Sequence, residues 1–133
     1  MEKRTIDNPW KLRTPPLTSE YEMYVDEKEG QEIIVCTVGK TVLHYDYRCL
    51  ADLHAMLKAT GDWMELGSKD EKQEANAGTV EYWARSPDNP IGGWYGLKKN
   101  FRGRFAMYVP PLMEELGLAE VEHNKRNNRM KAK

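Results

Sequence analysis

The first half of the chain alternates between apolar and polar positions, which is the pattern of half-buried β-strands. The alternation over residues 21–26 predicts a strand with one face on the core. Residues 32–38 are apolar on both faces, as in a central strand, and residues 41–45 alternate again. Gly39 opens a two-residue connection typical of a type II′ hairpin. We therefore predict a three-stranded antiparallel meander over residues 21–45.

Helical spacing replaces this alternation after residue 46. The apolar residues that fall on one stripe are Cys49, Leu50, Leu53, Met56 and Leu57. Asp46 is placed to cap the N-terminus of the helix, because its carboxylate can accept from the exposed amides of the first turn. Gly61 can take the left-handed conformation that ends a helix. A helix is therefore predicted over residues 46–60.

Shorter elements follow in the second half of the chain. A short helix is predicted over residues 79–85 and irregular structure over the Gly- and Pro-rich residues 87–96. Residues 104–109 alternate and indicate a strand. A second short helix opens at Pro110 and Pro111, where a missing amide is tolerated. Residues 118–123 are expected to form a last strand.

These elements predict an α+β fold. An antiparallel sheet begins with the meander, the 46–60 helix packs on it, and two short helices complete the architecture. The two later strands are expected to extend the same sheet. A chain of 133 residues suits one domain. We expect an extended N-terminal arm over residues 1–20, a single domain over residues 21–123, and a basic flexible tail over residues 124–133.

Bulk composition is that of an ordinary globular protein, with 40% hydrophobic and 31% charged residues. The longest apolar run, residues 33–36, is far too short to cross a bilayer. No apolar stretch follows the N-terminal charges, so we expect no secretory signal. Cys36 and Cys49 do not form a CxxC pair and are interpreted as buried free thiols in a reducing compartment. The chain is therefore expected to be cytoplasmic.

Charge is distributed unevenly along the chain. Residues 1–97 carry 11 Lys/Arg and 17 Asp/Glu, a net charge of −6, whereas residues 98–133 carry 9 and 4, a net charge of +5. This asymmetry is typical of a nucleic-acid face, or of a basic part that docks on the acidic part of the same or another copy. A pI near 6.3 disfavours a dedicated nucleic-acid binder. We expect self-association as a homodimer or larger oligomer.

Motifs of catalysis and cofactor binding are incomplete in this sequence. Residues 38–41 resemble the end of a phosphate-binding loop, but Ile34 stands where the loop needs glycine. His44, His54 and His123 lie far apart, without the spacing of metal ligands. We predict neither a metal site nor a cofactor. His123 is the histidine to test for chemistry, because it follows a predicted strand near the basic tail.

Ligand-competent residue types concentrate between residues 83 and 108. Glycines let a backbone approach a ligand closely, Trp and Tyr supply flat surfaces, and Arg recognises carboxylates and phosphates through a planar fork. The candidate contact residues for a ligand or partner are Arg85, Asp88, Asn89, Trp94, Tyr95, Arg102, Arg104 and His123. The alternative is structural: aromatics anchor a Gly/Pro loop, and arginines pair with the acidic half of the fold.

Three functions remain open. The first is a non-catalytic binding module that contacts a small anionic ligand or a partner through the 85–104 loop. The second is salt-dependent nucleic-acid binding through residues 98–104 and the basic tail. The third is a small enzyme with a pocket near Arg85, Asp88, Arg102 and His123; it comes last because no nucleophile–base pair is found.

Three motifs carry a resemblance to a known family. They are GGWYGL at residues 92–97, RGRF at residues 102–105 and YVPPL at residues 108–112. The chain resembles a family of small uncharacterised bacterial proteins, some of them encoded on mobile integron gene cassettes. Further similar stretches are residues 78–81, 85–90 and 116–124. The resemblance runs over most of the chain from Trp10. It implies a bacterial cytoplasmic setting and an accessory role, without an assigned activity.

Overall fold

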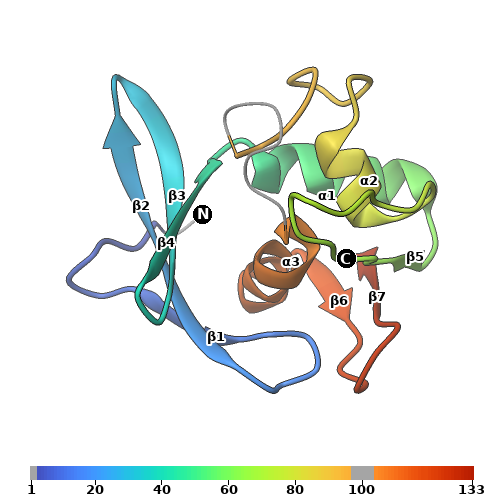
Figure 1. Cartoon of the computed structure of the whole chain (residues 1–133), viewed down its shortest axis with the longest axis horizontal. Coiled ribbons are helices and arrows are strands. Elements are labelled where there is room, and N and C mark those ends of the chain that lie inside the picture. The colour runs from blue at the N-terminus through green and yellow to red at the C-terminus, as the bar shows by residue number, and fades with distance from the viewer. Residues whose placement is uncertain (1–2, 97–103) are drawn as a thin grey trace.

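The computed structural model describes residues 3–96 and 104–133. Within these residues the chain forms two antiparallel sheets and three helices (Figure 1). In chain order the elements are β1 (Trp10–Arg13), β2 (Glu20–Lys28), β3 (Gln31–Val38), β4 (Thr41–Asp46), α1 (Cys49–Thr60), β5 (Met64–Glu65), α2 (Val80–Arg85), α3 (Phe105–Glu115), β6 (Ala119–Val121) and β7 (Arg129–Ala132). This architecture confirms the predicted α+β class. No helix in the described residues is long and apolar enough to cross a membrane.

The larger sheet has the strand order β1-β2-β3-β4, and its last three strands are the predicted meander. Glu29 and Gly30 both have positive φ, of 53° and 80°, which is the geometry of a type I′ hairpin turn. Gly39 has a φ of 59° at the following turn. The segment predicted as an extended arm contributes β1, whose residue Trp10 pairs with Met23 and is buried.

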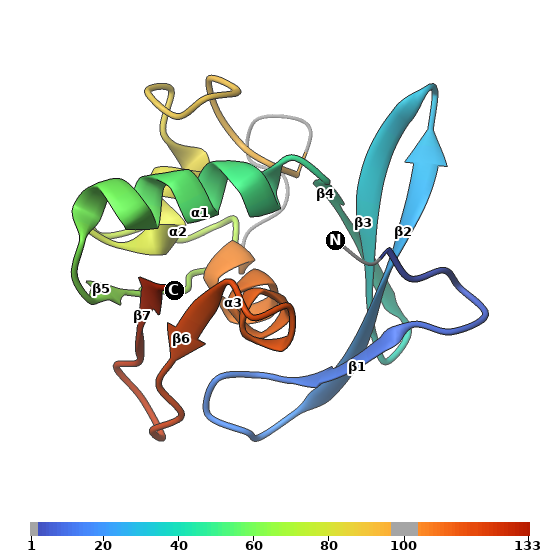
Figure 2. The same cartoon turned by 180° about the vertical axis from the view of Figure 1, so that it is seen from behind.

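The core lies between one face of this sheet and the helices (Figure 2). Tyr21 illustrates how the two parts are joined. Its hydroxyl donates to the backbone carbonyl of Tyr108 in α3 at 2.6 Å, and the two rings meet edge to face at 5.0 Å. Burial of the Tyr21 ring raises the pKa of its phenol well above the ordinary value. The sheet and α3 therefore share both apolar and polar contacts.

Helix α1 begins three residues later than the predicted start. Arg48 is its N-cap residue and makes no capping hydrogen bond with its side chain. The Asp46 carboxylate instead accepts the Arg48 backbone N–H at 3.1 Å, just before the helix. Gly61 ends α1 in the left-handed conformation, with a φ of 70°, and its N–H donates to the Leu57 carbonyl. The predicted end of the helix is confirmed.

Helix α3 corrects the prediction for residues 104–109. These residues were expected to form a strand, with a helix opening at Pro110, but α3 begins at Phe105 and contains both prolines. Its buried residues are Phe105, Ala106, Tyr108, Val109, Pro110, Pro111, Leu112 and Met113. A helix that is buried on most of its surface does not show the regular spacing of apolar and polar residues that identifies an amphipathic helix in a sequence. The short alternation and the proline pair therefore pointed to the wrong element.

The smaller sheet corrects a second expectation. Its strand order is β5-β7-β6, so β6 pairs with β7 instead of extending the meander. The segment predicted as a flexible basic tail contains β7, the central strand of this sheet, and Met130 in β7 is fully buried. The division into an arm, a domain and a tail stays a prediction. Cys36 and Cys49 are both free and buried, as predicted.

Candidate functional site

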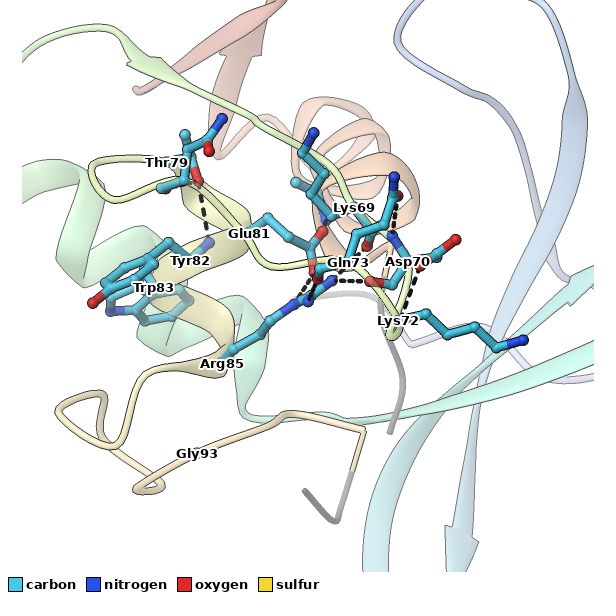
Figure 3. Close-up of polar contacts among 12 residues, drawn as sticks. Lys69, Asp70, Lys72, Gln73, Thr79, Glu81, Tyr82, Trp83, Arg85 and Gly93 are labelled. Carbon is cyan, nitrogen blue, oxygen red and sulfur yellow. Dashed lines mark hydrogen bonds and ion pairs between the residues drawn. The ribbon is translucent and has the colours of Figure 1, made fainter. Parts of the chain in front are cut away.

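Arg85, in the segment singled out by composition, is half-buried, and its guanidinium makes its hydrogen bonds within the fold. Its Nε donates to the Glu81 carboxylate at 3.0 Å. Nη1 donates to the carbonyl of Gln73 at 2.7 Å, and Nη2 donates to the carbonyls of Lys69 and Asp70 (Figure 3). Its guanidinium also lies 4.5 Å from the centre of the Trp94 ring. Arg85 therefore holds the 69–73 loop against α2.

Glu81 is the partner of Arg85 and is fully buried. Its Oε1 accepts the backbone N–H of Ala106 in the first turn of α3 at 3.0 Å. Burial raises the pKa of the Glu81 carboxyl, and this effect outweighs the hydrogen bond from Ala106 and the charge of Arg85, which lower it. Thr79 caps α2 by accepting the Tyr82 N–H at 3.2 Å, which fixes the helix that presents Glu81.

Asn89 and Tyr95 also use their polar groups within the fold. The Asn89 amide nitrogen donates to the carbonyls of Trp83 and Gly93, both at 2.8 Å, and its side-chain oxygen accepts the N–H of Gly93. The Tyr95 hydroxyl donates to Asp52 at 2.8 Å, and its ring stacks on Trp83 at 5.3 Å. Burial, followed by the contact with Asp52, raises the pKa of Tyr95.

The other candidate residues are spread over different parts of the molecule. Asp88 is exposed, and Arg104 lies 3.9 Å from the Asp70 carboxylate. Arg102 lies outside the described residues. His123 contacts Pro15 and Glu114 and shares no described cavity with Arg85. The structure thus brings Arg85, Trp94 and Arg104 around the 69–73 loop and leaves His123 elsewhere.

A cavity of about 380 Å³ opens on the other side of this loop. Its walls come from segments far apart in the sequence: the β1–β2 loop, the chain after β5, the N-terminal ends of α2 and α3, and the turn between β6 and β7. The lining residues are Pro15, Pro16, Glu65, Leu66, Gly67, Ser68, Lys69, Asn76, Thr79, Ala106, Met107, Arg126, Asn127 and Asn128. Figures 1 and 2 both show the β1–β2 loop beside the β6–β7 hairpin.

Two cations in this cavity have no ion-pair partner within residues 3–96 and 104–133. They are Lys69, which is half-buried, and Arg126, which is exposed. In Figure 3 the Lys69 side chain extends to the side of its loop opposite Arg85. The Ser68 hydroxyl is closed off from solvent and has no hydrogen-bond partner among the described residues. Two cations without an ion-pair partner and one hydroxyl without a hydrogen-bond partner among the described residues therefore lie at this cavity.

Unfavourable backbone conformations also gather around the cavity. Of the four described non-glycine residues with positive φ, Asn127 lines it, while Leu17 and Arg104 each lie within two residues of a lining residue. Such conformations cost about 1–3 kcal/mol each and cluster at functional sites. Gly67 has a φ of 60°, and a Cβ there would lie 2.5 Å from the Thr79 side chain.

The chemistry available at this cavity is recognition of a negative charge. Arg binds carboxylates and phosphates through a planar fork, and Lys supplies a compact point charge. Leu66 and Met107 offer apolar surface for the remainder of a ligand. Among the described residues no cluster of three or more His, Cys, Asp or Glu is placed to hold a metal ion. The sequence alone did not single out Ser68, Lys69 or Arg126 in this role.

The molecule is thus an α+β protein with two antiparallel sheets and a cavity lined by N-terminal, central and C-terminal segments of the chain. The chain belongs to a family of unknown function, DUF6855, whose model matches residues 2–133. This finding confirms the prediction that the chain resembles a family without an assigned activity. A search of curated proteins and a search of solved structures each found no match.

Proposed function

We propose that the protein is a binding module for a small anionic ligand, held in the cavity lined by Lys69 and Arg126. The observation that carries this proposal is that two cations without an ion-pair partner in the described residues line the same open cavity. A volume of about 380 Å³ lies in the usual range of small-molecule sites. A carboxylate, phosphate or sulfate group would contact the two cations, and the rest of the ligand would pack on Met107 and Leu66.

Arg85 holds the 69–73 loop in place from the side opposite the cavity. Arg85 does not contact the ligand in this proposal, because its N–H groups already donate hydrogen bonds to the Lys69, Asp70 and Gln73 carbonyls. It fixes the backbone from which the Lys69 side chain extends. In this proposal Arg85 of the predicted contact segment has a supporting role, and the predicted binding function is assigned to the adjoining cavity.

Sulfate is a suitable probe, because it carries a constant charge near neutral pH. We expect millimolar sulfate, added at constant ionic strength, to shift the NMR signals of the Ser68 and Asn127 amides. Lys69→Gln and Arg126→Gln should each weaken sulfate binding about two- to fivefold, the range expected for partly exposed ionic contacts. The matched controls are Lys72→Gln and Lys125→Gln, which remove exposed cations outside the cavity.

Equal weakening by all four substitutions would indicate nonspecific charge screening and would contradict the proposal. The proposal would also be contradicted if none of the four substitutions weakened sulfate binding. A steep salt-dependent affinity for single-stranded nucleic acid, abolished by Lys125→Gln but unaffected by Lys69→Gln, would instead favour the nucleic-acid alternative. In that alternative Arg129 is less available than its sequence suggests, because it pairs with Glu122 at 2.7 Å and lies over the Trp63 ring.

We also propose a setting and an assembly for the protein. The family resemblance supports a bacterial accessory protein, in some cases encoded on an integron cassette, and the two free buried thiols support a reducing cytoplasm. The opposite charges of the two parts of the chain support self-association. Light scattering coupled to size exclusion tests this assembly: a monomer at every concentration and at low salt would contradict it.

A further inference from the structure

We infer that His123 forms a protonation-dependent bridge that holds the Pro15 and Pro16 wall of the cavity against the end of α3. This inference rests on the proposed ligand site and concerns how that site is regulated. The bridge consists of the Pro15 carbonyl, the His123 ring and the Glu114 carboxylate. It joins the β1–β2 loop, the segment after β6, and α3.

The geometry of the bridge requires two donors on one ring. His123 Nδ1 lies 2.9 Å from the Pro15 carbonyl oxygen, and Nε2 lies 2.7 Å from Glu114 Oε2. A carbonyl oxygen and an ionised carboxylate can only accept hydrogen bonds. A neutral imidazole has one N–H and would face one of these acceptors with a lone pair. The imidazolium form, with two N–H groups, satisfies both.

The surroundings of the ring favour its charged form. Partial burial disfavours the charge, but the hydrogen bond and charge of Glu114 and the hydrogen bond to Pro15 together raise the pKa of His123 above its usual value. Glu114 is the charged group that faces the ring from α3, and the Pro15 carbonyl faces it from the β1–β2 loop. On its own segment the neighbouring Glu122 is held by Arg129 at 2.7 Å.

Deprotonation of His123 breaks its hydrogen bond to Pro15 in the wall of the cavity and keeps the one to Glu114 in α3. Of the two hydrogen bonds, the shorter and charge-assisted one to Glu114 retains the single proton. The Nδ1 lone pair then faces the Pro15 carbonyl and repels it. Leu17 and Thr14 hydrogen-bond within the β1–β2 loop itself, so these contacts do not replace the lost attachment. As pH rises through the pKa of His123, the wall formed by Pro15 and Pro16 moves away from the cavity.

Ligand-free NMR titration tests this bridge directly. The experiment follows the His123 ring and ¹³C-labelled methionine methyl groups from about pH 5.5 to about pH 8.5, where histidine titrates. Met107 lines the cavity, and Met23, fully buried in β2, is the control. We expect the Met107 methyl to shift with the same midpoint as the His123 ring. Glu114→Gln should lower this midpoint, and His123→Gln should make the Met107 signal independent of pH.

A Met107 signal that ignores the His123 titration, or a midpoint that Glu114→Gln leaves unchanged, would overturn the inference. Sulfate binding separates this failure from failure of the proposed function. We expect affinity to fall at least about fivefold between the two ends of the titration, the lower end of couplings between sites. Sulfate bound equally at both ends refutes the bridge and leaves the site intact. No binding at either end, with Met107 still following His123, refutes the site and leaves the bridge intact.

Discussion

The carboxylate of Glu81 accepts the backbone N–H of Ala106 at 3.0 Å, so that a residue of α2 caps the N-terminus of α3. Helix α3 finds no such cap in its own sequence. The preceding residue, Arg104, has a φ of 61° and makes no capping hydrogen bond with its side chain. Because Glu81 also pairs with Arg85, one buried carboxylate joins two helices and, through Arg85, the 69–73 loop.

Replacing Glu81 with alanine is expected to reduce the free energy of unfolding by about 3–5 kcal/mol, because breaking a buried ion pair leaves an uncompensated charge. The change would leave the half-buried Arg85 without its carboxylate and the Ala106 N–H without its acceptor. Urea denaturation followed by circular dichroism measures the effect. A matched control is Glu74→Ala, at an exposed position of the loop before α2, which should change stability by less than about 0.5 kcal/mol.

The double variant Glu81→Ala with Arg85→Met distinguishes the ion pair from simple loss of packing. Removing both charges should destabilise by less than the sum of the two single changes, because neither charge is then left alone. Additive losses would contradict the proposed coupling of the pair. A loss below about 1 kcal/mol for Glu81→Ala would show that α3 does not depend on this cap.

The parts of the fold that could be predicted are those specified by local patterns. The meander follows from alternating residues and from Gly39, and the end of α1 follows from Gly61. Helix α3 could not be predicted in this way. It is buried on most of its surface, contains Pro110 and Pro111, and receives its cap from a residue in another helix. Neither hydrophobic periodicity nor a local capping motif in the sequence reveals these three features.

The candidate site shows a similar division. The composition of residues 83–108 indicated a contact site there, and this stays a prediction. In the structure Arg85 of this segment holds the 69–73 loop in place. The cavity is assembled by long-range pairing, such as the hydrogen bond from the Leu66 N–H to the Asn128 carbonyl at 3.0 Å. Lys69 and Arg126 each stand in a polar stretch where a cation is ordinary. Their shared position appears only when β5 pairs with β7.

Gly67 and Gly78 provide a matched pair for testing how tightly the wall of the cavity is packed. Both have positive φ, of 60° and 83°, but only at Gly67 would a Cβ meet another side chain, at 2.5 Å from Thr79. Gly78→Ala should cost about 1 kcal/mol of stability for the backbone conformation alone. Gly67→Ala should cost about 2–4 kcal/mol, because overpacking adds to the same strain. Equal losses in thermal or urea denaturation would show that Thr79 moves freely.

Ser68→Ala is expected to weaken sulfate binding without reducing stability. The Ser68 hydroxyl has no partner in the described residues, and an unsatisfied buried polar group costs about 1–3 kcal/mol. Alanine should therefore leave the free energy of unfolding unchanged or raise it. Sulfate binding should weaken, because a rotated serine side chain can donate to an anion and alanine cannot. A destabilised variant with unaltered sulfate binding would assign Ser68 a purely structural role.

The two cysteines should resist modification in the native protein. Burial raises the pKa of the Cys36 thiol to about 12 and that of Cys49 well above its usual value. The thiolate is the reactive form, and at pH 8 a thiol with such a pKa is ionised only to about one part in ten thousand. We expect iodoacetamide to label neither cysteine in hours without denaturant and both within minutes in urea, as measured by mass spectrometry. Thr41→Cys, at an exposed position, should label at once in native buffer. Rapid native labelling of Cys36 would show instead that β3 opens locally.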